Sequence, residues 1–363
     1  MIKQYSKTLV SILFVAGIAS SCTDKESSDR LDLDMSQVRV LVANEGQYST
    51  GTASLSAITK DNITYANVFR EVNGRPLGDV AQSISVINNQ IYVALNNSCK
   101  IEVMDSKFKS VKTKVCAQGS IPGYVTYLGG DSIAVSDKNI NGKLMIMKTA
   151  DSNQSNEYLR TIETGSTMQM ILSNGKLYLG GSSLRVLQLG AMNKDQMITI
   201  KNSKGEDLAI SGDSKLVEDA KGNIWMLNQS YLYCINPRTD EVIRELPISG
   251  ITVGEWDGRL DISPNKEQLY FTASGKDPRD NKDIVGIATM SVNATEAPKS
   301  LKIDLTERVK VIYNMAISPE GTIFICDVEY GVLTRSNIHE LTTEGGKINT
   351  YRGGIMPQYI YFN

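Results

Sequence analysis

Short apolar stretches recur along this chain, and polar, turn-forming residues separate each stretch from the next. They are rich in β-branched and aromatic side chains, which predicts strands, and no long segment keeps the apolar spacing of an amphipathic helix. The stretches are Val40–Asn44, Ile91–Leu95, Ile133–Asp137, Leu177–Gly180, Ile224–Asn228, Leu269–Thr272 and Ile323–Asp327. Their first residues lie 42 to 54 positions apart. Seven such units, each long enough for four strands, predict an all-β, seven-bladed β-propeller over residues 37–363.

The two ends of the chain are expected to close this ring. Innermost strands are predicted for six blades, at Val80–Ile87, Tyr124–Leu128, Thr167–Leu172, Asp213–Glu218, Trp256–Ile262 and Val311–Ile317. The first blade has no such strand ahead of Val38, whereas an extra strand pattern occurs at Pro357–Phe362. We therefore expect Pro357–Phe362 to pair with the first blade, which would remove an exposed sheet edge.

The first 21 residues predict a bacterial lipoprotein signal peptide. Two lysines precede an apolar run of about ten residues, which is too short to span a bilayer as a helix. Small residues then lead to Cys22 in a pattern that resembles a lipobox, so Cys22 is the expected site of lipidation. An ordinary secretory peptide is the alternative. The polar residues 22–36 are expected to form a flexible tether, and Thr23–Glu26 resembles the acidic signal for the outer face of the outer membrane.

Composition narrows the range of functions. Cleavage after residue 21 would remove Lys3 and Lys7 and no acidic residue, which leaves 36 basic against 40 acidic side chains. This balance does not favour nucleic acid or an anionic membrane surface as a partner. His339 is the single histidine, and we expect it to be a surface residue. Metal sites and hydrolases that need paired imidazoles are therefore disfavoured, and we predict a protein without enzymatic activity, metal or cofactor.

Two cysteines flank a predicted hairpin. Cys99 and Cys116 lie symmetrically about a turn near Ser106–Lys109. Opposed residues on antiparallel strands can approach disulfide distance, and an exported protein meets oxidising conditions. A Cys99–Cys116 disulfide is therefore one reading, and a pair of unbonded thiols is the other. Cys234 and Cys326 lie in apolar strand patterns and are expected to be buried.

The candidate binding residues come from loops that share one face of a propeller. Loops between second and third strands, and linkers between blades, converge there around the central channel. In this chain they carry amides, a few aromatic residues and arginines, which suits a large, mostly neutral, amide-rich ligand. The alternative is that Asn and Asp occur because tight turns need them. The candidates are Asn44, Arg75, Asn96, Tyr124, Asp137, Asn228, Trp256, Arg279, Tyr330 and Arg352.

Several of these segments also resemble a known family. The sequences of Val42–Gly46, Val72–Ser83, Ile91–Val93, Asn96–Val103 and Met356–Tyr359 are similar to those of the YncE-like/DUF5074 surface propeller lipoproteins of gut anaerobes. This family includes the BtuG-type cobalamin-binding proteins. The resemblance implies a cell-surface protein that binds cobalamin or a related corrinoid and passes it to a TonB-dependent outer-membrane transporter.

Other functions remain open on the sequence. A surface protein for another nutrient, such as a glycan, haem or siderophore, would share the same fold. A glycan site should show aromatic platforms, and the chain has only two tryptophans. A propeller lactonase or lyase is a further alternative, although such enzymes need acid/base or metal-binding side chains in the channel. A scaffold that only stabilises a transporter complex is the last.

Overall fold

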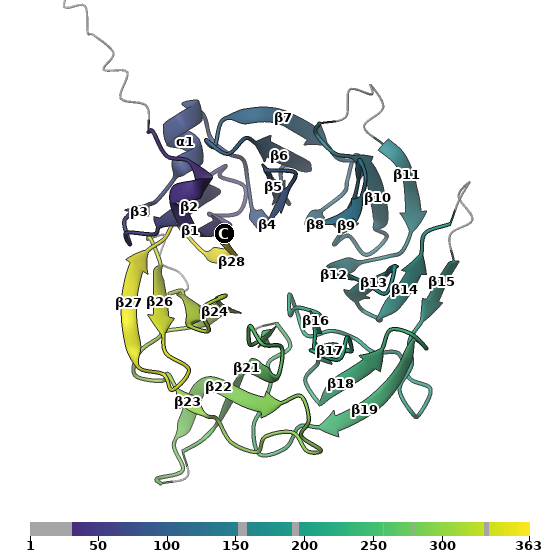
Figure 1. Ribbon diagram of the computed structural model, residues 1–363. Helices are drawn as coiled ribbons and strands as arrows, with labels where there is room; N and C mark the ends of the chain where they lie inside the picture. Colours follow the sequence, from purple (N-terminus) through teal and green to yellow (C-terminus); the bar gives the residue numbers. More distant parts are fainter. Residues whose placement is uncertain (1–30, 152–157, 191–195, 257, 278, 330–333) are drawn as a thin grey trace, which may run out of the picture. The chain divides into compact units, whose positions relative to one another are not determined.

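The alternating strand patterns form antiparallel sheets in the computed structural model, which describes residues 31–151, 158–190, 196–256, 258–277, 279–329 and 334–363 (Figure 1). Within these ranges the strands make seven four-stranded sheets, and residues 31–363 form one compact unit. The sheets are arranged as the blades of a seven-bladed β-propeller, with one strand of each blade beside the central channel (Figure 1). The predicted fold class is confirmed.

The blades are numbered along the chain, and their strands are given from the innermost outward. Blade 1 contains β28 (Pro357–Phe362), β1 (Val38–Asn44), β2 (Ser54–Thr59) and β3 (Thr64–Tyr65). Blade 2 contains β4 (Ala81–Ile87), β5 (Gln90–Leu95), β6 (Lys100–Met104) and β7 (Ser110–Val115). Blade 3 contains β8 (Pro122–Gly129), β9 (Ser132–Asp137), β10 (Lys143–Lys148) and β11 (Tyr158–Glu163). Blade 4 contains β12 (Thr167–Ser173), β13 (Lys176–Gly181), β14 (Arg185–Gln188) and β15 (Gln196–Thr199).

The remaining three blades follow the same order. Blade 5 contains β16 (Val217–Glu218), β17 (Ile224–Leu227), β18 (Tyr231–Asn236) and β19 (Glu241–Pro247). Blade 6 contains β20 (Leu260–Ile262), β21 (Gln268–Lys276), β22 (Asp283–Ser291) and β23 (Ile303–Asp304). Blade 7 contains β24 (Ile312–Ile317), β25 (Ile323–Asp327), β26 (Asn337–Leu341) and β27 (Lys347–Arg352).

The ring closes as the sequence predicts. β28 has the predicted bounds and pairs antiparallel with β1, where Ile360 lies opposite Val42. β1 therefore has a hydrogen-bonded neighbour on each side, β28 and β2. Ile360 and Val42 are buried in one cluster with Phe324 of blade 7, so the closing strand also joins the first blade to the last.

Two innermost strands are shorter than predicted. Strand pairing in blade 5 begins only at Val217, and in blade 6 only at Leu260. Before them the two linkers pack backbone against backbone, and a Cβ atom added to Gly212 would lie 2.6 Å from the carbonyl oxygen of Trp256. Gly212 also has a φ of +41°, which a residue with a side chain rarely adopts. The residues before β16 and β20 therefore pack against each other instead of extending these two strands.

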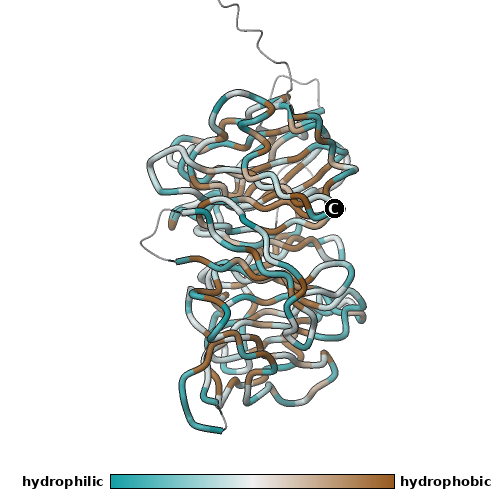
Figure 2. The backbone as a smooth tube through the Cα atoms, turned by 90° about the vertical axis from the view of Figure 1, so that its left-hand side faces the viewer, coloured by the Kyte–Doolittle hydropathy of each residue, from teal (hydrophilic) through white to brown (hydrophobic). Residues whose placement is uncertain are grey.

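The hydrophobic core lies between neighbouring blades. Trp225 of blade 5 and Phe271 of blade 6 belong to one buried cluster, and Tyr92 of blade 2 packs with Val135 of blade 3 in another. Figure 2 shows apolar segments running between hydrophilic loops. The second strand of a blade, such as β9, β17 or β25, thus buries side chains on both faces, which explains why the sequence there is a short continuous apolar run.

Two features correct the expectations for the N-terminal region. A six-residue helix, α1 (Val68–Asn73), lies in the linker from β3 to β4, where only strands were expected. Within the described ranges, no helix has the length and apolar character of a membrane span.

Residues 31–36, expected to belong to the flexible tether, are packed: Leu33 and Met35 are buried, and Met35 begins a 3₁₀ turn, η1 (Met35–Gln37). The signal peptide, Cys22 and the rest of the tether lie outside the described residues.

Candidate ligand-binding site at the mouth of the channel

One face of the propeller carries the start of the innermost strands together with the loops between second and third strands. Backbone hydrogen bonds join these loops to the linkers, for example from Asn96 N to Val80 O at 2.8 Å and from Lys138 N to Ile121 O at 2.9 Å. We call this side the mouth face. It is the face on which the sequence placed the candidate ligand-binding loops.

Polar side chains from several blades converge at the mouth on the carboxylate of Asp213. Tyr124 Oη donates to Asp213 Oδ1 at 3.0 Å, and Lys138 Nζ lies 3.0 and 3.2 Å from the two carboxylate oxygens. Gln358 Nε2 donates at 3.0 Å and Gln82 Nε2 at 3.4 Å to Oδ2. These side chains come from blades 1, 2 and 3 and from the linker before blade 5. We call these five residues the Asp213 cluster.

The Asp213 cluster sits well inside the channel. The side chains of Asp213 and Lys138 are 18% and 17% exposed. Burial by itself would raise the pKa of Asp213, but the nearby charges of Lys138 and Arg259 and the hydrogen bonds to Lys138 and Tyr124 lower it below its ordinary value. Burial, followed by the charge of Asp213, raises the pKa of Tyr124 well above its ordinary range. The carboxylate therefore stays ionised and the phenol stays protonated.

Amide groups surround this cluster. Gln169 Nε2 donates to the backbone oxygen of Asp213 at 3.4 Å, which brings in blade 4. Asn96 Nδ2 lies 3.4 Å from Gln82 Oε1, which also accepts from Lys138 Nζ at 3.1 Å. Gln358 Oε1 is buried and has no hydrogen-bond partner among the described residues. The mouth thus presents several primary amides held in fixed positions.

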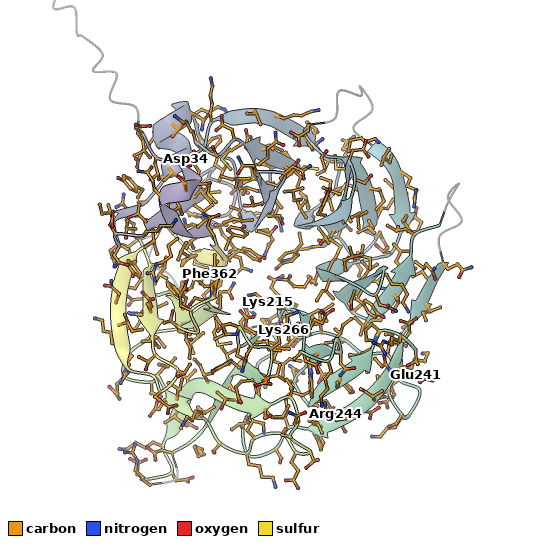
Figure 3. The ribbon with its side chains drawn as sticks, in the orientation of Figure 1. Asp34, Lys215, Glu241, Arg244, Lys266 and Phe362 are labelled. Carbon is orange, nitrogen blue, oxygen red and sulfur yellow. The ribbon has the colours of Figure 1, made fainter. Side chains whose placement is uncertain are left out.

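A second charged pair lies within the channel. Lys215 Nζ contacts Asp261 Oδ2 at 2.5 Å, and the same oxygen accepts from Ile317 N at 3.0 Å. Figure 3 labels Lys215 near the centre of the ring. Burial would lower the pKa of Lys215, but the charge of Asp261 raises it, so the amine stays protonated and is not a free nucleophile.

Of the ten candidates from the sequence, three lie at this mouth. Tyr124 and Asn96 belong to the network around Asp213. Trp256 lies in the linker before β20 with its side chain 72% exposed, and its carbonyl oxygen accepts from Arg259 Nη1 at 2.7 Å. Trp256 therefore offers an aromatic surface beside the buried polar groups.

Three other candidates use their polar groups inside the protein. Asn44 is fully buried: its Nδ2 donates to Ser56 Oγ at 2.9 Å, and its Oδ1 accepts from Gly354 N at 3.0 Å. Asp137 Oδ1 accepts from two backbone N–H groups, both at 2.9 Å. Asn228 Oδ1 does the same within its own turn, at 2.9 and 2.8 Å. Asp137 and Asn228 shape turns, as the alternative explanation of their occurrence states, and Asn44 joins its strand to β2 and to Gly354.

The three candidate arginines bind other parts of the protein. Arg75 Nη2 contacts the fully buried carboxylate of Glu102 on β6 at 2.6 Å, in blade 2. Arg279, which is highly exposed, forms an ion pair with Asp277 at 2.6 Å. Arg352 lines a separate hollow, described next. The last candidate, Tyr330, lies outside the described residues.

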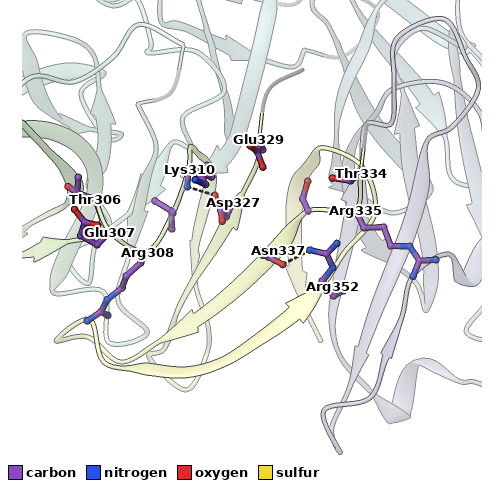
Figure 4. A pocket seen from close by; sticks show the side chains of 12 residues that line it. Thr306, Glu307, Arg308, Lys310, Asp327, Glu329, Thr334, Arg335, Asn337 and Arg352 are labelled. Carbon is purple, nitrogen blue, oxygen red and sulfur yellow. Dashed lines mark hydrogen bonds between the residues drawn. The ribbon is translucent and has the colours of Figure 1, made fainter. Parts of the chain in front are cut away.

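A second hollow opens between the linker into blade 7 and the loops of that blade (Figure 4). Its volume is about 360 Å³, and Arg308, Lys310, Arg335 and Arg352 are among the side chains around it. Asp327 also lines this hollow and accepts from the backbone N–H of Lys310 at 2.7 Å. This carboxylate also lies 3.2 Å from His339 Nε2, so the histidine, expected at the surface, is largely buried at 14% exposure.

Sequence reasoning missed most of the channel-facing residues. Lys138 lies in a loop that was recognised as polar, and Asp213 begins a strand that was recognised as innermost, yet neither was selected. Gln82 and Gln358 each lie within the first two residues of an innermost strand. A polar residue near the start of a strand beside the channel is the signal that could have found them.

The fold and the mouth together define a β-propeller with a polar, amide-lined channel entrance. The chain belongs to the family described as "Domain of unknown function (DUF5074)", whose model matches residues 39–323. No curated protein matches the chain in sequence.

Solved structures share the fold at low sequence identity. A protein from Bacteroides fragilis, provisionally named a 6-phosphogluconolactonase, is 12% identical with a TM-score of 0.61, over 90% of this chain and 98% of that one. A Bacteroides uniformis protein with the same provisional name is 13% identical with a TM-score of 0.59, over 90% and 99%. A functionally unknown protein from Desulfotomaculum acetoxidans is 11% identical with a TM-score of 0.55, over 90% and 98%. These likenesses concern the fold alone.

Proposed function

We propose that this protein is a ligand-capture propeller that binds a corrinoid of the cobalamin type at the mouth face. The observation that carries the proposal is the set of primary amides fixed around Asp213, beside the exposed indole of Trp256. A corrin ring is broad and fringed with primary amides, which pair naturally with amide side chains and backbone groups. The resemblance of residues 42–46, 72–83, 91–93, 96–98 and 100–103 to a family that includes cobalamin-binding proteins supports the same ligand.

The rigidity of the mouth favours capture. The side chains of the Asp213 cluster come from separate blades and already bond to one another, so they lose little conformational entropy when a ligand binds. A preformed site of this kind gains affinity mainly through slow dissociation. Binding followed by delivery requires such retention.

Lactone hydrolysis is the competing function, since the proteins provisionally named 6-phosphogluconolactonases share the fold. A general base works best when its pKa lies near the operating pH. The pKa of Asp213 is lowered and its oxygens are occupied by several donors, while Tyr124 and Lys215 hold their protons. These groups are poor bases and nucleophiles at neutral pH, which favours binding over catalysis.

Lipid anchoring at Cys22 on the outside of the cell and a TonB-dependent transporter as partner complete the proposal. Three of the most exposed large apolar side chains lie in mouth-face loops: Tyr48 is 70%, Ile140 82% and Trp256 72% exposed. Apolar side chains that stand out from a polar surface are typical of protein contacts. Pull-down of the transporter from membranes, lost in a Tyr48→Ser/Ile140→Ser double variant, would support this contact.

The ligand itself is tested by titrating the purified protein with cyanocobalamin under calorimetry. We expect saturable binding, and about tenfold weaker binding when Trp256→Ala removes the aromatic surface. Ile243→Ala on β19, which is 46% exposed away from the mouth, is the matched control and should bind normally. No binding at micromolar cyanocobalamin would exclude the corrinoid. Turnover of 6-phosphogluconolactone would favour the competing enzyme.

A further inference from the structure

Arg259 holds a buried guanidinium group at the mouth of the channel. The residue is 5% exposed and comes directly before β20. Its Nη1 donates to the carbonyl oxygens of Trp256 and Gly258 at 2.7 and 3.2 Å, and its backbone N–H donates to Thr272 Oγ1 at 2.8 Å. These bonds fix the guanidinium beside the backbone of the exposed Trp256.

The opposite edge of this guanidinium is unused. Neither Nε nor Nη2 of Arg259 has a hydrogen-bond partner among the described residues, and Nε is enclosed. Nε and Nη2 together form one of the two edges through which arginine binds carboxylate or phosphate with paired hydrogen bonds. Leaving the enclosed Nε without a partner is unfavourable, and Nη2, which is not enclosed, is the atom of this edge that a ligand can reach.

The two acidic groups nearby have partners of their own. Asp213 accepts from Tyr124, Lys138 and two glutamines, which fills its acceptor positions. Glu45 Oε2 accepts from Tyr313 Oη at 2.6 Å. Burial raises the pKa of both carboxyl groups, and the positive charge of Arg259 is among the smaller effects that lower the pKa of each. Arg259 is nonetheless in direct contact with neither.

Arg279 shows what a satisfied edge looks like in this chain. Its Nε and Nη2 both bond to the carboxylate of Asp277, at 3.0 and 2.6 Å. The same two atoms that are occupied in this exposed arginine are thus vacant in the buried Arg259. Arg39 and Arg185 also have a buried Nε without a partner, but their Nη2 atoms bond to Glu340 and to Ser166 O, whereas in Arg259 Nη2 is unpaired as well.

We propose that Arg259 is the anion subsite of the mouth: it binds a phosphate or carboxylate group of a ligand whose ring system lies on Trp256. This inference rests on the proposed capture function, because it gives that ligand a negatively charged substituent. The subsite orients the ligand, and the amides around Asp213 then contact its neutral part.

The test uses inorganic phosphate and acetate as separate probes, with sodium chloride at equal ionic strength as reference. We expect a saturable change in tryptophan fluorescence in the millimolar range with at least one probe, since Trp256 is directly bonded to Arg259 and Trp225 is buried elsewhere. A response to phosphate alone identifies a phosphorylated ligand, and a response to acetate alone a carboxylated one. Arg259→Gln should weaken the response at least about tenfold, and Arg259→Lys should fall between. Arg279→Gln should respond as the wild type does.

Two results would overturn this subsite. One is the lack of any saturable effect of phosphate or acetate on the wild-type protein, in fluorescence or in melting temperature, which a bound anion must raise by mass action. This readout does not depend on whether Arg259→Gln folds. The other is an Arg259→Gln variant that folds and responds unchanged. Cyanocobalamin binding by the wild type is measured separately, so failure of the subsite would leave the capture function standing.

Discussion

At the scale of single residues, Asp213 is the most heavily used polar group of the channel. Its carboxylate takes hydrogen bonds from side chains of three other blades, and its partner Lys138 is mostly buried. Removing one member of such a pair lowers the free energy of unfolding by more than the intact pair contributes to it, because the other charge is left buried without compensation. The cluster therefore ties blades together as well as shaping the mouth.

Asp213→Asn should lower the free energy of unfolding by about 3 kcal/mol, since the amide cannot accept all the donors and leaves Lys138 unpaired. Urea denaturation followed by circular dichroism measures the change. Lys299→Ala, which removes the exposed partner of Glu296, is the control and should leave the midpoint unchanged. Equal stability of Asp213→Asn and wild type would show that the cluster does not tie the blades.

Glu45 gives a prediction for pH. Burial raises the pKa of its carboxyl group above the ordinary value of 4.5, although the hydrogen bond from Tyr313 opposes the rise. The folded protein thus binds a proton more readily than the unfolded chain, and stability at this site falls as pH rises. Wild type should therefore gain stability relative to Glu45→Gln as the pH is lowered from 7 toward 4.5. If the urea midpoints of the two proteins changed by the same amount across this pH range, the raised pKa of Glu45 would be contradicted.

At this scale the sequence could identify residue types but only some of the roles. Trp256 and Tyr124 were selected because they lie in linkers between blades, which converge on one face of a propeller, and both lie at the mouth. Asn44 was selected on the same reasoning as Asn96, yet its amide is consumed by Ser56 and Gly354. Which of two similar amides faces the channel depends on turn geometry. A strand pattern fixes the face of a strand but leaves the direction of a loop side chain open.

At the scale of elements, the closing strand is the feature that the sequence predicted best. The predicted strand Pro357–Phe362 has the same bounds as β28. Its alternation of apolar residues is a local property of the sequence, so it can be recognised even though the partner strand lies at the other end of the chain. The short strands β16 and β20 could not be predicted, since contacts between the two linkers, such as the hydrogen bond from Ser211 Oγ to Gly254 O, replace strand pairing there. Helix α1 was missed because its six residues are too few to show a helical period.

The closing strand should carry a large share of the stability. Ile360→Ala in β28 removes a side chain that is 4% exposed, and we expect a loss of about 3 kcal/mol in the free energy of unfolding. Ile348→Ala in β27 makes the same chemical change at a position that is 48% exposed. Its effect should stay within about 0.5 kcal/mol. Chemical denaturation of both variants compares the two sites, and equal losses would contradict a special role for β28.

The predicted disulfide belongs to the edge of blade 2. Cys116 N donates to Cys99 O at 2.9 Å, and both side chains contact one apolar cluster. The sulfurs are not joined in the structure, where Cys99 Sγ lies 3.1 Å from Ala117 O. The bridge stays a prediction for protein exposed to oxidising conditions. A Cys99–Cys116 linked peptide in a non-reducing digest would establish it, and alkylation of both thiols without prior reduction would exclude it.

At the scale of the whole molecule, the pairing of β28 with β1 closes the ring and holds the seven sheets as one unit. Neighbouring blades share apolar clusters all along the described ring, and β28 joins the first blade to the last. Repeat arrays without closure lose cooperativity, since each repeat contacts only its neighbours. A closed ring should instead unfold as a single unit.

The two tryptophans allow this to be measured. Trp225 is fully buried in blade 5, where its Nε1 donates to Asp219 at 2.9 Å, so its fluorescence reports on a blade far from the closure in sequence. In the wild type, fluorescence and circular dichroism should give the same urea midpoint. Deletion of residues 357–363 should separate the two midpoints, because the blades can then unfold independently. A single shared transition in the truncated protein would show that closure is not what couples the blades.

The position of β28 also has a consequence for how the protein comes to be made. The strand that completes the first blade is encoded downstream of every other strand, so the growing chain emerges with its first sheet unfinished. Until the final segment arrives, β1 presents bare N–H and C=O groups to the surroundings. Premature termination, or proteolytic loss of the last strand, would leave β1 as an exposed edge strand that can pair with other chains. Cells that make this propeller thus have reason to degrade incomplete copies quickly.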